Sequence, residues 1–117
     1  MRLLKINKYY SAFIDNYHVK SKSYKEMKAE ILAQSFSFGD AWTYYLAPLG
    51  YETDEIIINA QSLQRAWAYE KGISNYKSIN LFDIVIAQVK DFKPDILWFD
   101  CTDDELLYRI KTEVQGI

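Results

Sequence analysis

The stretch YETDEIIINAQSLQRAWAYEKG, residues 51–72, decides the fold, because it joins a strand pattern directly to a helix pattern. Residues 51–58 become β-branched toward their end, and three consecutive isoleucines are typical of a strand that is covered on both faces in a parallel sheet. Apolar side chains then recur at helical spacing on one inward face, at Leu63, Ala66 and Trp67. Asn59 is placed to cap this helix and Gly72 to end it.

Two further short apolar runs predict strands, at residues 3–6 and at residues 96–99. Apolar residues recur at helical spacing over residues 81–92, and Pro94 closes this helix. The predicted order is therefore strand, helices, strand, helices, strand and helix. Strands that alternate with helices indicate a parallel sheet with right-handed crossovers. We expect a Rossmann-like three-layer α/β domain, in which a small parallel sheet of three to four strands is flanked by helices.

Capping boxes indicate two helix starts. Ser23 with Glu26, and Thr102 with Glu105, have the spacing at which two side chains each bond a backbone N–H of the first helical turn. We therefore predict that one helix begins after residue 23 and another after residue 102. Residues 7–22 show no sustained period and are rich in tyrosine, so we expect a long loop, which in a compact domain is often functional.

Ten tyrosines and three tryptophans are many for a chain of 117 residues. Amphipathic rings of this kind can line a site for a sugar or a nucleobase. We nevertheless expect most of them in the core. A helical pattern over residues 42–49, stopped by Pro48 and Gly50, places Trp42 and Tyr45 on an apolar face.

The composition argues against several classes of function. Fourteen basic and sixteen acidic side chains give a net charge of −2, without the basic stripe that nucleic-acid binding needs. Cys101 is the only cysteine and His18 the only histidine, which excludes an intramolecular disulfide and a histidine-rich metal site. Neither a GxGxxG loop nor a P-loop occurs, and we predict no cofactor. Without a signal peptide or an apolar run of roughly 20 residues, the protein is expected to be cytoplasmic and to have no membrane span.

Four acids, Asp100, Asp103, Asp104 and Glu105, lie just beyond the third predicted strand, where open α/β sheets bind their ligands. Carboxylates there could hold a hard cation such as magnesium. With Thr102 as the N-cap, however, the next three acids fall in the first helical turn, where the helix dipole stabilises negative charge without a ligand. We therefore predict no metal site at this position.

Longer segments of the chain resemble a known family. Residues 23–72, from SYKEMKAEIL through GYE to NAQSLQRAWAYEKG, and residues 81–100, LFDIVIAQVKDFKPDILWFD, are similar to the N-terminal domain of bacterial GT-B glycosyltransferases. These are the spore-maturation and capsule-type enzymes, which are glycosyltransferase family 4-like. The resemblance covers roughly residues 9–111. Its most specific residues are Asn59, Leu63, Gln64, Ala66, Trp67, Ala68, Glu70 and Gly72, with the pair Pro94 and Asp95.

The resemblance implies that residues 1–117 form one Rossmann-like domain, which faces the acceptor in a two-domain transferase. A C-terminal domain absent from this chain would bind the nucleotide sugar. The expected partners are that domain and a saccharide or other acceptor, and the chain alone is expected to be inactive. Asp100 is the candidate catalytic base near the acceptor hydroxyl. The other residues that the resemblance places along the interdomain cleft are Tyr9, Tyr10, Asn59, Gln64 and Thr102.

The last residues predict that the fold is not complete. Residues 115–117 look like a helix stop followed by the first residue of another strand. We expect either that the natural protein continues beyond Ile117 or that a partner copy completes the small sheet.

A second hypothesis stays open. The chain could be a non-enzymatic α/β binding module, flavodoxin-like or receiver-like, whose acidic strand ends bind a cation or a partner. A receiver needs acids after its first strand as well, and the first predicted strand ends in Asn7 and Lys8, which counts against a receiver. Helical spacing places Gln64 one position from the core face, so its side chain could reach either a ligand or a neighbouring strand.

Overall fold

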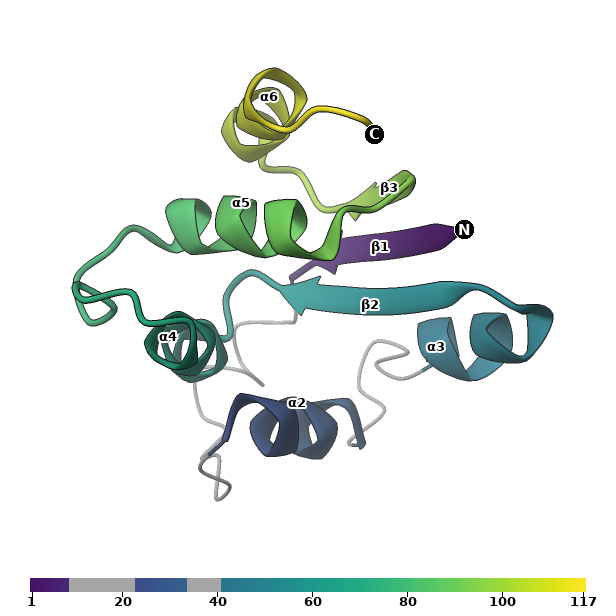
Figure 1. Cartoon of the computed structure of the whole chain (residues 1–117), viewed down its shortest axis with the longest axis horizontal. Coiled ribbons are helices and arrows are strands. Elements are labelled where there is room, and N and C mark those ends of the chain that lie inside the picture. The colour runs from purple at the N-terminus through teal and green to yellow at the C-terminus, as the bar shows by residue number, and fades with distance from the viewer. Residues whose placement is uncertain (9–22, 34–40) are drawn as a thin grey trace.

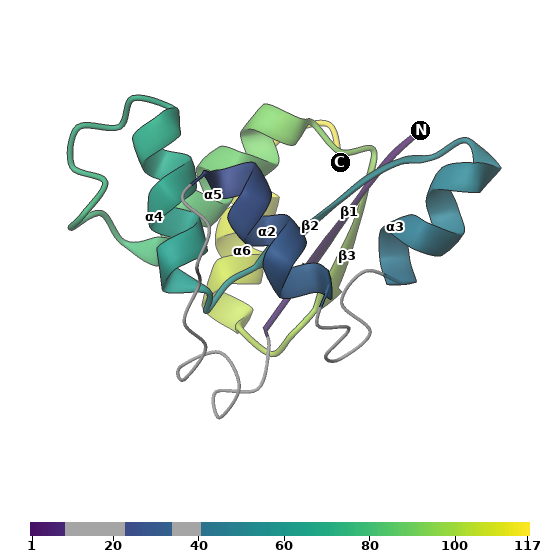
Figure 2. The same cartoon turned by 90° about the horizontal axis from the view of Figure 1, so that it is seen from below.

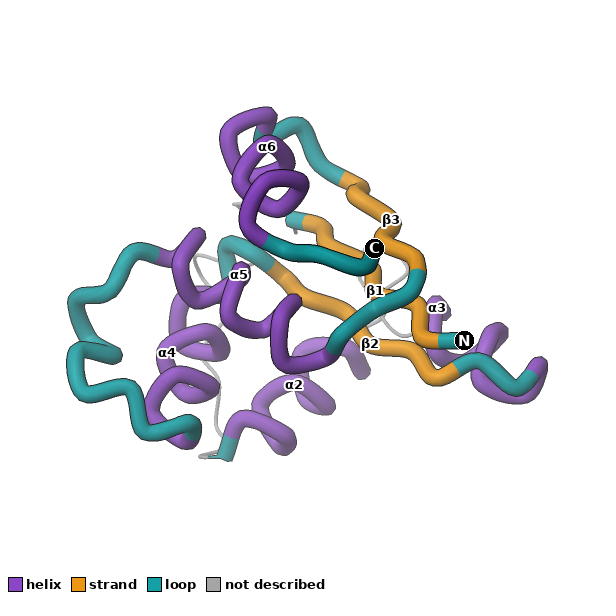
Figure 3. The backbone as a smooth tube through the Cα atoms, turned by 45° about the horizontal axis from the view of Figure 1, so that its top comes forward, coloured by secondary structure: helices purple, strands orange, loops and turns teal. Residues whose placement is uncertain are grey.

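The sheet consists of three parallel strands, as the alternation of strand and helix patterns predicts. The computed structural model describes residues 1–8, 23–33 and 41–117, except for the side chains of residues 41–43. The strands are β1 (Arg2–Asn7), β2 (Glu52–Ile57) and β3 (Ile96–Asp100). Their order is β2-β1-β3, and both pairings are parallel, so the carboxyl ends of all three meet at one edge of the sheet. Figure 3 shows β1 between the other two strands.

Helices cover both faces of this sheet. They are α2 (Tyr24–Ala33), α3 (Ala41–Leu46), the 3-10 helix η2 (Ala47–Leu49), α4 (Gln61–Glu70), α5 (Leu81–Phe92) and α6 (Asp104–Glu113). In Figure 1, α2 lies below the strands and α6 lies above them, and Figure 2 shows α2 in front when the molecule is seen from below. Both α5 and α6 pack against the side of the sheet opposite α2. We call the two sides of the sheet the α2 face and the α5 face. The predicted α/β architecture, a small parallel sheet flanked by helices, is confirmed.

The alternation of side chains along the strands separates the two cores. On the α5 face, the buried core residues are Leu4, Ile6, Ile56, Ile58, Val85, Ile86, Val89, Leu106 and Ile110. On the α2 face, Ile57 packs with Ile31 of α2 and with Leu63 of α4. The consecutive isoleucines at the end of β2 are thus all buried, because neighbouring residues of a strand point to opposite faces and both faces are covered.

Two predicted helix caps are wrong. Asn59 does not cap α4, because the chain first makes a turn in which Ala60 N donates to Ile57 O, and Ala60 itself occupies the N-cap. Thr102 does not cap α6, because the first helical bond runs from Leu107 N to Asp103 O, so the cap lies one residue later. The Ser23 cap is confirmed: its Oγ accepts from Glu26 N at 3.2 Å.

The aromatic residues divide between core and surface. Trp67 is buried as predicted, with 9% of its surface exposed. Tyr45 was predicted to be in the core, but it is 70% exposed, and its ring meets that of the equally exposed Tyr44 edge to face. Tyr9 and Tyr10, with most of the predicted tyrosine-rich loop, and the Trp42 side chain lie outside the description.

Candidate functional site

The path of the chain across the sheet identifies where a ligand is expected. From β1 the chain passes through α2 to β2 at one side, and then through α4 and α5 to β3 at the other side of β1. The connections therefore change direction at β1, and the carboxyl ends of β1 and β3 flank a topological switch point. Open α/β sheets bind ligands in the crevice at such a point.

Four side chains form a compact group on the α2 face at this point. In the parallel register Lys5 lies beside Trp98, and Asn7 lies beside Asp100. Lys5 Nζ is 4.0 Å from Asp100 Oδ2, and the Asp100 side chain is 60% exposed, whereas that of Lys5 is largely buried. Trp98 is 57% exposed. We call Lys5, Asn7, Trp98 and Asp100 the β1/β3 group.

A buried polar pair lies behind this group. Asn7 Nδ2 donates to Glu55 Oε1 at 2.9 Å, and both residues are almost fully buried. Asn7 Oδ1 is buried and accepts no hydrogen bond in the described part of the chain. Burial raises the pKa of Glu55 from 4.5 to about 7, although Lys5 and the hydrogen bond from Asn7 act in the opposite direction. The open acceptor on a buried amide is a polar group that a ligand could satisfy.

Two of the four acids at the end of β3 and beyond it pair with lysines of β1 and its end. Asp103 pairs with Lys8 at 2.5 Å, in addition to the contact between Asp100 and Lys5. Within residues 1–8, 23–33 and 41–117, no group of three or more histidine, cysteine or acidic side chains is placed to hold a metal ion. Cys101 lies between these acids, and burial raises the pKa of its thiol, which disfavours a nucleophilic thiolate.

The structure separates the residues that the sequence singled out. Asp100 and Thr102 are exposed at the carboxyl end of β3, and Asn59 is half-buried just after β2 at the same edge of the sheet. Gln64 is 1% exposed and lies in the core instead. Its Nε2 donates to Ile57 O at 2.5 Å, and its Oε1 accepts from the side chain of Gln88, so it links β2, α4 and α5.

The most specific block of the resemblance, residues 59–72, has a structural explanation at several of its positions. Leu63 and Trp67 pack in the core beside the buried Gln64. Glu70 Oε2 accepts from Tyr24 N at 2.6 Å and so satisfies the first turn of α2. Gly72 follows α4 with a φ of +79°, which L side chains rarely adopt. The block therefore fixes the packing of α4 against α2, α5 and the sheet.

Lys5, Trp98 and Glu55 were not identified from the sequence as site residues. Lys5 and Trp98 were included only as parts of the strands predicted at residues 3–6 and 96–99. Exposed and half-buried residues alternate along β3. Because alternate residues of a strand point to the same face, this pattern could have placed Trp98 and Asp100 on one face. Only the strand register could have placed Lys5 beside Trp98.

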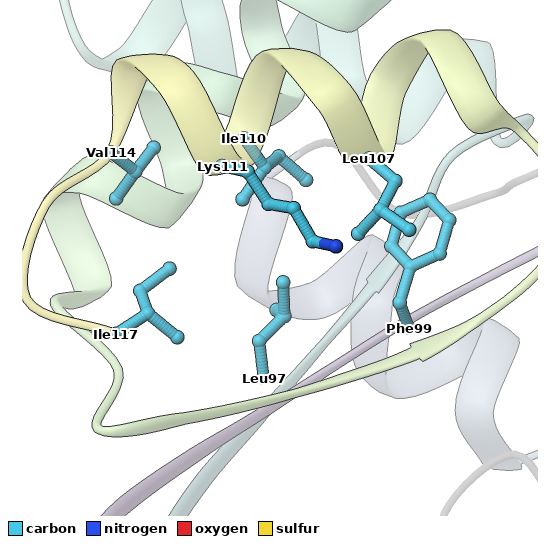
Figure 4. Close-up of a pocket in the computed structure, with 7 residues that line it drawn as sticks. All are labelled: Leu97, Phe99, Leu107, Ile110, Lys111, Val114 and Ile117. Atoms are coloured by element: carbon cyan, nitrogen blue, oxygen red, sulfur yellow. The ribbon is translucent and has the colours of Figure 1, made fainter.

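An apolar hollow lies on the opposite side of β3. It has a volume of about 280 Å³ between β3, α6 and the C-terminal residues, and Figure 4 shows its lining. The lining residues are Leu97, Phe99, Leu107, Ile110, Lys111, Val114 and Ile117. Lys111 is the only charged residue in this lining, so the hollow lacks the convergent polar groups of a specific ligand site.

Comparison of the chain with protein-family models, curated proteins and solved structures found no significant match. Among the helices in the described residues, none is both long enough and apolar enough to cross a bilayer.

Proposed function

We propose that this chain is the acceptor-side domain of a nucleotide-sugar-dependent glycosyltransferase, and that it binds a neutral hydroxyl-bearing acceptor beside Asn7 and Asp100. The observation that carries the proposal is the buried Oδ1 of Asn7, which accepts no hydrogen bond from the described residues, together with the exposed carboxylate of its register partner Asp100 at the switch point of the sheet. An acceptor with two hydroxyl groups can supply one O–H donor to each of these oxygens. The identification of the enzyme class rests on the resemblance of residues 23–72 and 81–100 to GT-B transferases.

The charge at this edge of the sheet supports an acceptor rather than a nucleotide. Asp100, Asp103, Asp104 and Glu105 outnumber the two lysines of β1 and its end, so a diphosphate would meet net negative charge. The chain also lacks a glycine-rich phosphate loop. The nucleotide sugar is therefore assigned to a second domain, and the activity to the cytoplasm, where nucleotide sugars are made available to such enzymes.

In the complete enzyme, Asp100 is the proposed general base. Its carboxylate would take the proton that the acceptor hydroxyl loses as the oxygen attacks the anomeric carbon of the donor sugar, while the nucleotide leaves with the bonding electron pair. Lys5 lies 4.0 Å behind the carboxylate and positions it. Without the donor-binding domain, residues 1–117 are expected to bind an acceptor but not to transfer a sugar.

Amide NMR spectra of residues 1–117 test this proposal. Titration with a panel of neutral acceptors, including methyl glycosides and glycerol, is expected to shift the resonances of Asn7, Asp100 and Thr102, whereas uridine diphosphate glucose binds this edge more weakly. Asp100→Asn should weaken acceptor binding, and Asp91→Asn, an exposed acid on α5, should not. Tighter binding of the nucleotide sugar at these residues would contradict the proposal. So would its turnover by this chain at about 1 s⁻¹ or faster.

The strand order favours one alternative. The order β2-β1-β3 is the one with which flavodoxin-like folds begin, and such folds also serve as non-enzymatic binding modules. In that case the acidic edge would bind a cation, although Lys5 and Lys8 already lie against two of its carboxylates. Calorimetry with magnesium distinguishes the two: micromolar binding that Asp100→Ala abolishes would support the module.

A further inference from the structure

We propose that the exposed ring of Trp98 is a stacking platform for an uncharged sugar ring, whose hydroxyl groups hydrogen bond to Asp100 and Asn7. This inference rests on the proposed acceptor-binding function and deepens it, because it assigns the acceptor to the saccharides and names the side chain that selects them. Trp98 and Asp100 are the exposed members of the β1/β3 group on the α2 face, whereas Lys5 and Asn7 are largely buried beside them.

The spacing within the β1/β3 group suits one sugar ring. Lys5 and Trp98 are register partners, and so are Asn7 and Asp100. Neighbouring strands lie about 4.8 Å apart, and residues two apart along a strand are separated by about 6.6 Å, so the four Cα atoms outline a patch of those dimensions. A pyranose that lies on the Trp98 ring can therefore direct hydroxyl groups to Asp100 without leaving the patch.

The exposure of Trp98 is unusual for its position. Both Trp67 and Trp98 lie in regular elements, but Trp67 is 9% exposed and Trp98 is 57% exposed. Large aromatic rings dominate the energetics of cores and interfaces, and they are common at binding sites where one side is apolar and the other is wet. Leu97 and Phe99, the neighbours of Trp98 in β3, pack against the core of the α5 face, so the strand is held from behind while Trp98 faces outward.

The polar neighbours match a polyhydroxyl compound. Asp100 offers an acceptor carboxylate, Asn7 an Oδ1 that no described residue bonds, and Lys5 a donor ammonium that lies 4.0 Å from Asp100. Sugars present hydroxyl groups as both donors and acceptors along the ring edge, and apolar C–H bonds on the ring face. The opposite charges of Lys5 and Asp100 compensate each other, so the group favours a ligand without net charge.

Fluorescence and NMR of residues 1–117 test this inference with methyl glycosides of glucose, galactose and N-acetylglucosamine as probes. At least one of them is expected to shift the indole N–H resonance of Trp98 and to protect its fluorescence from acrylamide quenching. Trp98→Ala should weaken binding by about five- to tenfold, since aromatic contacts contribute about 1–1.5 kcal/mol. Trp98→Phe should retain part of the affinity. Tyr108→Ala removes a ring of similar exposure from α6 and should leave binding unchanged.

The outcomes separate this inference from the proposed function. If glycerol or another acceptor without a sugar ring shifts Asn7 and Asp100 while no glycoside affects Trp98, saccharide stacking is overturned and acceptor binding stands. Equal affinity of the Trp98→Ala variant for a glycoside, with an unchanged melting temperature, also overturns stacking. If uridine or adenosine binds Trp98 more tightly than every glycoside, the site selects a nucleobase, and both proposals fail.

Discussion

Replacing Glu55 by glutamine should make the stability of this protein less dependent on pH. Glu55 is 2% exposed, and its carboxyl group accepts a hydrogen bond from Asn7. The charged groups that act on it are Lys5 beside it on β1, Lys28 of α2 and Asp54 of its own strand. Burial outweighs the two lysines and raises the pKa of Glu55 from 4.5 to about 7. The folded protein therefore keeps a proton on Glu55 that the unfolded chain releases at lower pH.

The sign and size of the effect follow from this difference. Between pH 4.5 and about 7 the folded state binds one proton more than the unfolded state, so the free energy of unfolding falls as the pH rises. The contribution is fully present below the pKa of the unfolded chain and is lost as the pH rises through the folded pKa. A tenfold difference in proton affinity corresponds to about 1.4 kcal/mol, so the full loss is roughly 3 kcal/mol by pH 8.

Urea denaturation at several pH values measures this effect. Glu55→Gln should match the wild type near pH 5 and exceed it by roughly 3 kcal/mol at pH 8, because glutamine keeps the acceptor for Asn7 without a charge. The melting temperature at pH 8 should then rise by roughly 10 °C for a domain of this size. Glu52→Gln, on the same strand but exposed, should change stability by less than about 1 kcal/mol at either pH. A difference between Glu55→Gln and the wild type that stays constant from pH 5 to pH 8 would refute the reasoning.

Three further predictions concern the packing of α4, each measured by urea denaturation. Gln64→Leu should cost about 1–3 kcal/mol, because the buried amide of Gln88 loses its acceptor and the Ile57 carbonyl is left with the donor Ala60 N. The double change with Gln88→Leu should cost less than the sum of the two single changes, and strict additivity would contradict this link. Glu70→Ala should cost about 1 kcal/mol through the lost bond to Tyr24 N, and an unchanged midpoint would contradict its capping role. Gly72→Ala should cost about 1 kcal/mol from backbone strain alone, since nothing lies within 4 Å of an added Cβ; a stabilised variant would contradict this.

The strands and most helices could be predicted because their signals are local. The run from Ile56 to Ile58 predicts a strand that is covered on both faces, and the apolar period over residues 81–92 predicts a helix. The strand order could not be predicted, since it depends on contacts such as the one from Arg2 N to Asp95 Oδ2 across the chain. The caps at Asn59 and Thr102 were misplaced by one residue each, because turn hydrogen bonds moved both helix starts.

Only part of the candidate site could be predicted from the sequence, because some of its residues are brought together by long-range strand pairing. Asp100 could be found because the carboxyl end of a strand is a recognisable position. Lys5 and Trp98 are separated by most of the chain and become neighbours only through the register of β1 with β3. Lys5 is a charged residue between buried neighbours in β1. The sequence alone does not show which residue of another strand lies beside it, so its role could not be predicted.

Residues 59–72, which carry the most specific part of the resemblance, and the exposed side chains of the candidate site therefore belong to different parts of the molecule. Gln64 lies in the block, but it is buried and bonded on both sides, so substitutions there report mainly on folding. Trp98 and Asp100 lie outside residues 59–72, on the α2 face of β3, while the alternate residues Leu97 and Phe99 pack β3 against the core of the α5 face. Substitutions of Trp98 and Asp100 can consequently change ligand binding while the core stays intact. If the β1/β3 group is the site, Gln64 variants should lose stability, whereas Trp98 and Asp100 variants should lose ligand binding and keep their stability.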